Sequence, residues 1–268
     1  MPINNFMIKK HGKDDIFERE NLTSIPNALQ KANLYEQMGD YNTALEIYKE
    51  ITKINPNFPP GWNNQGNIYF NLNKFDEALK CYDKCIELNP NHMNALSCEG
   101  IIYIKLGEYE KANNALKKCL EAYPGDVTNM ANRSYALMEL GKYDEAIQLN
   151  LQAIEIDSEV PGIYNNLARC YENLGDFESA IKAYDKGIKK NPNHGATYNN
   201  KAWALRKINQ HDEALKYYEK AIEIDGENPL YLKNIAKTYK EKNEMDKAKE
   251  YYDKALKLDS TIEKFDDI

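Results

Sequence analysis

One cysteine–histidine group is the first candidate for chemistry in this sequence. Cys81 and Cys85 are four residues apart, so a helix would place both sulfur atoms on one face, and His92 and Cys98 follow closely. Thiolates and imidazoles are the ligands that zinc prefers, which makes this group a candidate metal site. The alternative is core packing, because a small thiol suits a buried helix position. We favour packing, and we expect no metal and no cofactor.

The four histidines are the candidates for acid–base chemistry, and each lies in a polar stretch: His11, His92, His194 and His211. A general base needs a reacting partner within hydrogen-bond reach, and no motif supplies one. The sequence also lacks a glycine-rich phosphate loop, a nucleophile elbow and a metalloprotease helix. We therefore expect solvated histidines, no catalytic residue and no enzyme activity.

The composition is too polar for a compact globule of 268 residues. Charged residues make up 29%, whereas an aromatic content of 11% argues against disorder. No apolar run is long enough to cross a membrane, and the N-terminal stretch lacks the features of a secretory signal. Five cysteines suit a reducing compartment, and a net charge of −7 disfavours nucleic acid. These features predict a cytoplasmic protein that binds neither nucleic acid nor membrane.

A gapless period of 34 residues organises the chain. Its clearest marker is a row of seven alanines: Ala44, Ala78, Ala112, Ala146, Ala180, Ala214 and Ala248. With this alanine as position 20, seven units follow: 25–58, 59–92, 93–126, 127–160, 161–194, 195–228 and 229–262. Residues 1–24 form a leader that is a candidate cap, and residues 263–268 form a short tail.

Each unit predicts two helices. Positions 4, 8 and 11 give the first helix an inner face, and positions 20, 24, 27 and 28 give the second helix an apolar stripe. Position 8 is always small, and tyrosine is frequent at positions 11 and 24. Glycine or asparagine at position 15 predicts a left-handed residue that ends the first helix. The fourth unit is the weakest, since Asn150 occupies its core position 24.

The pattern resembles the tetratricopeptide repeat. The second unit carries the motif residues at the family spacing, with Gln65 in place of the motif leucine: Trp62, Gly66, Tyr69, Ala78, Tyr82 and Pro90. The resemblance implies an all-α fold, a right-handed superhelical solenoid of antiparallel helix pairs. It also implies an inner groove lined by the first helices.

Positions 2, 5, 6, 9, 12 and 13 of the first helices are then expected to face this groove. Position 6 holds a row of amides: Asn64, Asn132, Asn166, Asn200 and Asn234. Neighbouring positions add Asn63, Asn67, Asn165 and Asn199. An amide both donates and accepts, so the row suits the main chain of an extended peptide. It is similar to the asparagine ladder of the O-linked N-acetylglucosamine transferase repeat domain. The alternative is inheritance by duplication, with solvated amides.

Charge is uneven along the predicted groove. In the last three units the groove positions hold six basic residues: Arg169, Arg206, Lys207, Lys233, Lys237 and Lys240. Only Glu172 and Glu241 oppose them there. Trp203 lies among these residues, either to stack on a ligand or to pack between repeats. We therefore expect the C-terminal half of the groove to prefer an acidic peptide.

The first functional hypothesis is a non-catalytic scaffold that binds an extended peptide of a partner protein in the groove. The second is a structural solenoid that associates with itself through its C-terminal face. The third is a regulatory or adaptor subunit of an enzyme or secretion complex supplied by other chains. The sequence identifies no particular partner.

Overall fold

The structure, a computed structural model, describes residues 25–263, and every regular element among them is an α-helix. The predicted leader 1–24 and nearly all of the predicted tail lie outside the described residues. Seven first helices are present: α1 (Ile25–Gln37), α3 (Pro59–Asn71), α5 (Met93–Lys105), α7 (Val127–Glu139), α9 (Pro161–Asn173), α11 (Gly195–Lys207) and α13 (Pro229–Glu241). Seven second helices alternate with them: α2 (Tyr41–Ile54), α4 (Phe75–Leu88), α6 (Tyr109–Ala122), α8 (Tyr143–Ile156), α10 (Phe177–Lys190), α12 (His211–Asp225) and α14 (Met245–Leu258).

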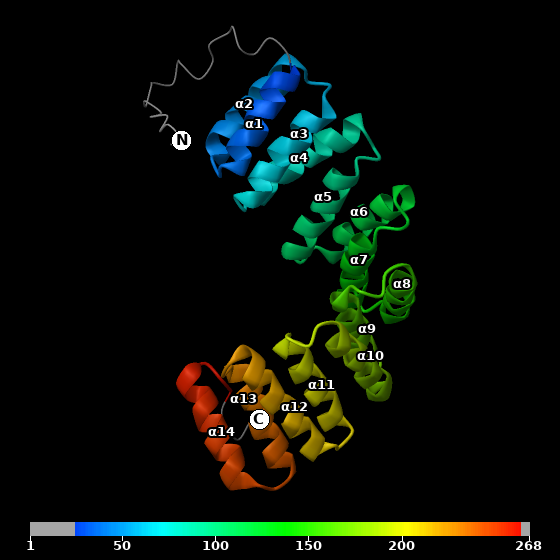
Figure 1. The fold of residues 1–268 in the computed structure, drawn as a ribbon. Helices are drawn as coiled ribbons and strands as arrows, with labels where there is room; N and C mark the ends of the chain where they lie inside the picture. Colours follow the sequence, from blue (N-terminus) through cyan, green and yellow to red (C-terminus); the bar gives the residue numbers. More distant parts are fainter. Residues whose placement is uncertain (1–24, 264–268) are drawn as a thin grey trace, which may run out of the picture. The chain divides into compact units, whose positions relative to one another are not determined.

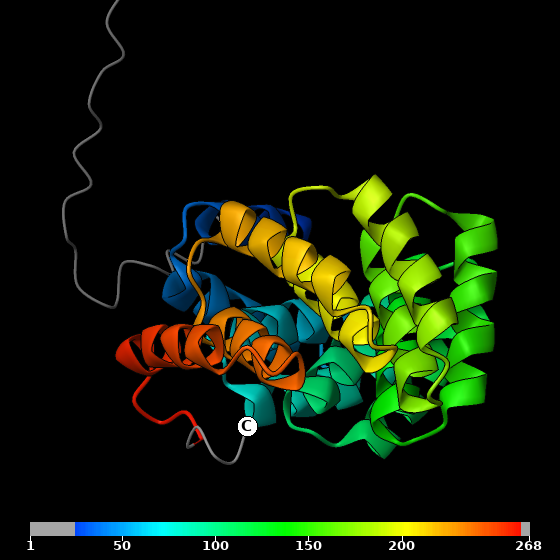
Figure 2. The same ribbon diagram turned by 90° about the horizontal axis from the view of Figure 1, so that it is seen from below.

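These helices form antiparallel pairs within two compact units, which in the described part are residues 25–102 and 103–263 (Figure 1). Helix α5 begins in the first unit and ends in the second. Within the second unit α8, α10 and α12 each pack on their own first helix and on the next first helix, as α10 does on α9 and α11. Figure 2 shows the last pair, α13 and α14, side by side.

Every first helix ends in the same turn. The residue at position 15 is left-handed in all seven repeats, with φ between 56° and 79°, and it is asparagine at Asn73, Asn209 and Asn243. In the first repeat Gly39 donates its backbone N–H to the carbonyl of Glu36, and Asp40 donates to Tyr35. The same two bonds recur in each repeat and satisfy carbonyl groups that a helix end leaves free. The predicted left-handed turn is confirmed.

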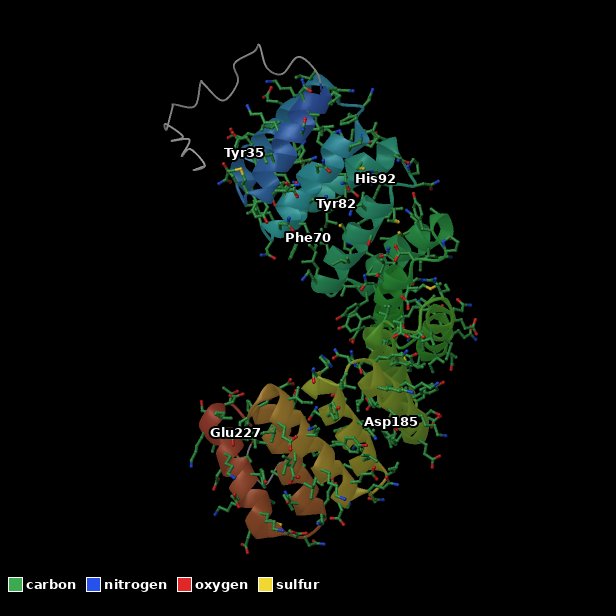
Figure 3. The ribbon with its side chains drawn as sticks, in the orientation of Figure 1. Tyr35, Phe70, Tyr82, His92, Asp185 and Glu227 are labelled. Atoms are coloured by element: carbon green, nitrogen blue, oxygen red, sulfur yellow. The ribbon has the colours of Figure 1, made fainter. Side chains whose placement is uncertain are left out.

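Small residues let the two helices of a pair approach closely. All seven position-20 alanines are fully buried, as predicted. At position 8, a Cβ atom on Gly66 would lie 2.5 Å from the ring of Tyr82. The glycine is therefore needed because the tyrosine ring occupies the space beside it, and Tyr82 lies inside the helix stack (Figure 3). Close packing of this kind gives each repeat its apolar core.

The fourth repeat has a flaw in its core, at the position where the sequence predicted weakness. Asn150 is fully buried, and neither its side-chain nitrogen nor its oxygen has a hydrogen-bond partner among the described residues. Leu116 and Tyr184 fill the same position 24 in the neighbouring repeats. A buried polar group without a partner costs free energy of folding, so this repeat is locally destabilised.

Within residues 25–263, no helix is long and apolar enough to cross a membrane.

Candidate functional site

The asparagines at position 6 are partly occupied by bonds inside the protein. Asn166 donates from Nδ2 to the carbonyl oxygen of Ala131, 3.1 Å away on the preceding first helix. Asn234 repeats this arrangement with Nδ2 2.9 Å from Oδ1 of Asn199. In both cases position 6 reaches position 5 of the repeat before it. These amides therefore connect successive first helices.

Two further position-6 amides accept a hydrogen bond from their own neighbour. Asn63 donates to Asn64, and Asn199 donates to Asn200, each over 3.1 Å. The Asn132 amide forms no hydrogen bond with any described residue, although it too is half-buried. The row predicted from the sequence is thus present on the first helices, but its members differ in how much of each amide remains available.

Several positions expected to face the groove are instead buried. The exposed fractions are 7% for Asn63, 4% for Asn199, 7% for Asn234 and 8% for Arg206. They belong to positions 5, 6 and 12, where side chains of one first helix meet the neighbouring repeat. Sequence periodicity defines the side of a helix, but the depth of a side chain depends on how closely the next helix approaches. These four side chains are therefore less accessible than a position on the groove side of a helix would suggest.

Other predicted residues also have partners within the protein. Asn67 accepts a hydrogen bond from the hydroxyl group of Tyr82 at 2.8 Å. Asn165 exchanges two hydrogen bonds with Thr197, over 3.1 and 3.2 Å. These amides help to hold neighbouring helices together, because buried polar groups contribute to stability when they are paired.

A pocket of about 270 Å³ brings four of the predicted site residues together. It is lined by side chains of three first helices, α9, α11 and α13: Glu172, Asn199, Asn200, Trp203, Leu230 and Asn234. Asn199, Asn200, Trp203 and Asn234 were predicted. Glu172 was named in the sequence only as an acidic residue that opposes the basic ones. Leu230 was missed because no other repeat has a leucine at position 2.

Glu172 is the unusual group in this pocket. Its Oε1 is buried and has no hydrogen-bond partner among the described residues. Burial raises the pKa of its carboxyl group to about 7, and the opposing influence of the Tyr184 hydroxyl group and of Arg169 is weaker. The pocket is therefore lined by an acid whose charged form is only partly compensated.

Trp203 is held in place from two sides. Its ring meets Phe177 edge to face, with centroids 5.8 Å apart, and the ammonium group of Lys207 lies 5.2 Å from its centroid. The structure is therefore compatible with both alternatives for this tryptophan, contact with a ligand and packing between repeats. It packs on α10, and it also lines the pocket.

Both arginines among the six basic residues are already paired with a carboxylate. Arg169 lies 3.3 Å from Glu139 and over the ring of Tyr135. The buried Arg206 lies 3.0 Å from Glu241. Their charges are thus partly compensated, and the predicted basic character rests mainly on lysines.

Lys207, Lys233 and Lys237 form what we call the lysine cluster. Burial, together with repulsion from Lys233, Arg206 and Lys207, lowers the pKa of Lys237. One carboxylate opposes this repulsion: Oε2 of Glu263 lies 3.6 Å from Lys233 and 3.9 Å from Lys237. Glu263 is the first residue of the predicted tail, and no feature of the sequence places it against the first helices.

Lys201 shows that not every lysine here is available to a ligand. It is 3% exposed, and its Nζ donates to Asp185 at 2.6 Å and to Tyr217 at 2.5 Å. Burial opposes its charge, yet these two hydrogen bonds outweigh that effect and the pKa is raised. Asp185, labelled in Figure 3, comes from α10, so the pair connects two repeats.

The cysteine–histidine group lies in the first unit. Cys81 and Cys85 are buried, and burial raises the pKa of each thiol to about 11. Thiols in this state are poor metal ligands at neutral pH. Among residues 25–263, no three histidine, cysteine or acidic side chains are grouped so that they could hold a metal ion.

Solved structures share this fold. A tetratricopeptide repeat protein from Parabacteroides merdae is 20% identical, covers 90% of this chain and 96% of its own, and has a TM-score of 0.71. The C-terminal part of such a protein from Cytophaga hutchinsonii is 21% identical over 89% of this chain and 98% of its own, with a TM-score of 0.69. YrrB is 21% identical over 69% and 95%, with a TM-score of 0.59.

A comparison with curated proteins found no match. Four sequence profiles of the tetratricopeptide repeat do match, at residues 27–58, 59–92, 81–112, 99–126, 126–189, 163–227 and 229–262. All four describe this repeat, and none describes an enzyme. Because these matches cover nearly all of residues 27–262, the chain belongs to the tetratricopeptide repeat family.

Proposed function

We propose that this protein is a non-catalytic scaffold that binds an extended, acidic peptide segment of a partner protein. The binding surface is the first-helix face of the second unit, which we define as the pocket residues on α9, α11 and α13 together with the lysine cluster. The observation that carries the proposal is the pocket itself, where amides, an aromatic ring and an apolar side chain from three successive repeats converge. Such a mixture is typical of a recognition site.

The lysine cluster supports the preference for acidic residues. Three lysines lie near one another, and the lowered pKa of Lys237 reflects the cost of holding them together in a partly buried place. A carboxylate of a bound peptide would relieve this repulsion, as Glu263 does within the chain. Clustered charge also speeds the encounter with an oppositely charged ligand.

Relatives with the same fold support the class of ligand. YrrB is described as a tetratricopeptide repeat protein with an unusual peptide-binding site. At 21% identity the likeness is one of fold, so the residues that bind the peptide must be tested in this chain.

The test compares two labelled hexapeptides by fluorescence anisotropy. One consists of aspartate and glutamate, and the other replaces them by asparagine and glutamine. We expect the acidic peptide to bind at least about tenfold more tightly at low salt, and we expect added salt to weaken this binding. The paired substitution Lys233→Gln with Lys237→Gln should remove the preference.

The matched control changes two exposed lysines of the same unit that lie on second helices, Lys216→Gln on α12 and Lys249→Gln on α14. It removes the same total charge and should leave the preference intact. Equal affinity for both peptides, or equal losses in the two double variants, would refute the proposal.

A second candidate function is self-association through α14. Leu256 on this helix is 37% exposed, whereas Leu120, at the same position 28 of the third repeat, is 8% exposed. Leu258 is exposed beside it. Light scattering over a range of concentrations tests this function: a mass that rises with concentration in the parent, and less in Leu256→Lys, supports association, and a constant mass excludes it.

A further inference from the structure

The pocket on α9, α11 and α13 is lined in part by an acid, Glu172, whose charge is only partly compensated within the protein. Glu172 lines a space of about 270 Å³, and its Oε1 is buried. The Tyr184 hydroxyl group and Arg169 favour the charged form of this carboxyl group, but burial outweighs them. A desolvated carboxylate gains most from a cation, which supplies both a charge and hydrogen-bond donors. The internal groups near it provide this only in part, because Arg169 is shared with Glu139, 3.3 Å away, and the Tyr184 hydroxyl group carries no charge.

The shape and lining of the pocket narrow the class of ligand. Pockets for small molecules usually measure about 300–1,000 Å³, so this one suits a single long side chain. Trp203 and Leu230 offer apolar surface to a hydrocarbon stem, and Glu172 offers an acceptor to its end. Lysine and arginine combine such a stem with a charged tip.

We propose that this pocket receives a lysine or arginine side chain of the bound peptide, with its charged end at Glu172. The inference rests on the proposed function and refines it, because the ligand then carries a basic residue beside its acidic stretch. Lys207 already lies over the ring of Trp203, so repulsion directs the ligand's charge toward Glu172 and leaves its stem against the indole. The pocket would thus bind a basic residue of the peptide, and the lysine cluster would bind its acidic residues.

The raised pKa of Glu172 agrees with this assignment. A cation bound beside the carboxyl group would lower that pKa and release a proton at neutral pH. Binding of a neutral side chain would not do so.

The first experiment probes the pocket alone. Trp62→Phe leaves Trp203 as the single tryptophan, and its fluorescence then reports on the pocket. The probe is N-acetyl-arginine methylamide, and the control is the citrulline counterpart, which has nearly the same shape without the charge. We expect a saturable change with the arginine compound and an affinity weaker by at least about tenfold for citrulline.

Two variants in this background locate the interaction. Glu172→Gln keeps the size of the side chain and should abolish the preference for arginine over citrulline. The matched control is Glu36→Gln at the same position 12 of the first repeat, where the carboxylate accepts from Tyr48 at 3.2 Å. That variant should keep the preference. Thermal unfolding checks that both variants remain folded.

The outcomes separate this inference from the proposed function. If the arginine and citrulline compounds bind equally, or if Glu172→Gln keeps the preference, the pocket assignment is wrong even when the acidic hexapeptide binds. If the arginine compound binds through Glu172 but the acidic hexapeptide does not bind, the pocket assignment stands and the acidic preference fails.

Discussion

Asn234 and Asn199 are joined by a hydrogen bond between buried amides, with Nδ2 of the first 2.9 Å from Oδ1 of the second. They belong to α13 and α11, so the bond connects two repeats. Asn199 in turn donates to Asn200, which lines the same pocket. The amide row therefore holds the first-helix face in shape while it lines the pocket.

Asn234→Ala should lower the free energy of unfolding, because it leaves the buried Oδ1 of Asn199 without this donor. The expected loss is about 1–3 kcal/mol. Asn132→Ala is the matched control at the same position, and without an internal bond to lose it should change stability by less than about 1 kcal/mol. Urea unfolding followed by circular dichroism measures both. Equal effects would show that the amide bond contributes nothing.

Asn150→Leu should stabilise the protein. Both polar atoms of Asn150 are buried and unpaired, and leucine is already accommodated at this position in the third repeat as Leu116. Removing two unsatisfied groups with the same number of side-chain heavy atoms should raise the free energy of unfolding by roughly 1–3 kcal/mol. Gln152→Leu on the exposed side of the same helix is the control, and it should have little effect on the unfolding midpoint. A lower midpoint for Asn150→Leu would contradict the argument.

Glu172 should make stability depend on pH. The pKa of its carboxyl group is about 7 in the folded protein, above the ordinary value of about 4.3, because burial outweighs the help of Tyr184 and Arg169. The folded state then holds this proton more tightly than the unfolded state. The free energy of unfolding therefore falls as pH rises between these two values, by at most roughly 4 kcal/mol.

Glu172→Gln cannot lose a proton and should lack this decline. Relative to the parent, the variant should therefore be more stable at about pH 8 than at about pH 5. Urea titrations at the two pH values measure the difference. If the stability difference between variant and parent is the same at both, the carboxyl group is not perturbed.

Glu263 should compete with an acidic ligand, since its carboxylate lies beside Lys233 and Lys237. Glu263→Gln removes that charge and should strengthen binding of the acidic hexapeptide by about two- to tenfold at low salt. Glu223→Gln on the outer helix α12 changes the net charge equally and should have a smaller effect. Anisotropy titrations measure the affinity of both variants for the acidic hexapeptide. Equal increases in affinity would indicate a general effect of net charge.

The sequence was sufficient to predict the helical repeats, because the residue patterns that define them are local and recur in every unit. The left-handed residue at position 15, the buried alanine at position 20 and the weak core at Asn150 each follow from residue type and spacing. The contacts within the candidate site could not be predicted in this way. That Asn234 reaches Asn199, or that Glu263 meets Lys233, depends on the offset between helices that lie far apart in sequence.

The same limit explains why charge counting overstated the basic character of the site. Arg206 was counted as an exposed cation, but it is buried and lies beside Glu241, a residue 35 positions away. Glu172 was counted as one negative charge among several. Its importance comes from the lack of a partner for Oε1, and only the packing of the surrounding repeats produces that lack.

The identical turns at the end of every first helix have a consequence for how this chain can change length. Each turn has the same backbone hydrogen bonds, and no repeat contains an inserted residue. One block of 34 residues is therefore a complete structural unit, which we call a cassette. A genetic duplication or deletion of whole cassettes leaves the same positions in contact, whereas a change of one residue inside a helix rotates the faces beyond it by about 100°. Such a protein can gain or lose ligand contacts in units of one repeat while the remaining ones keep their chemistry.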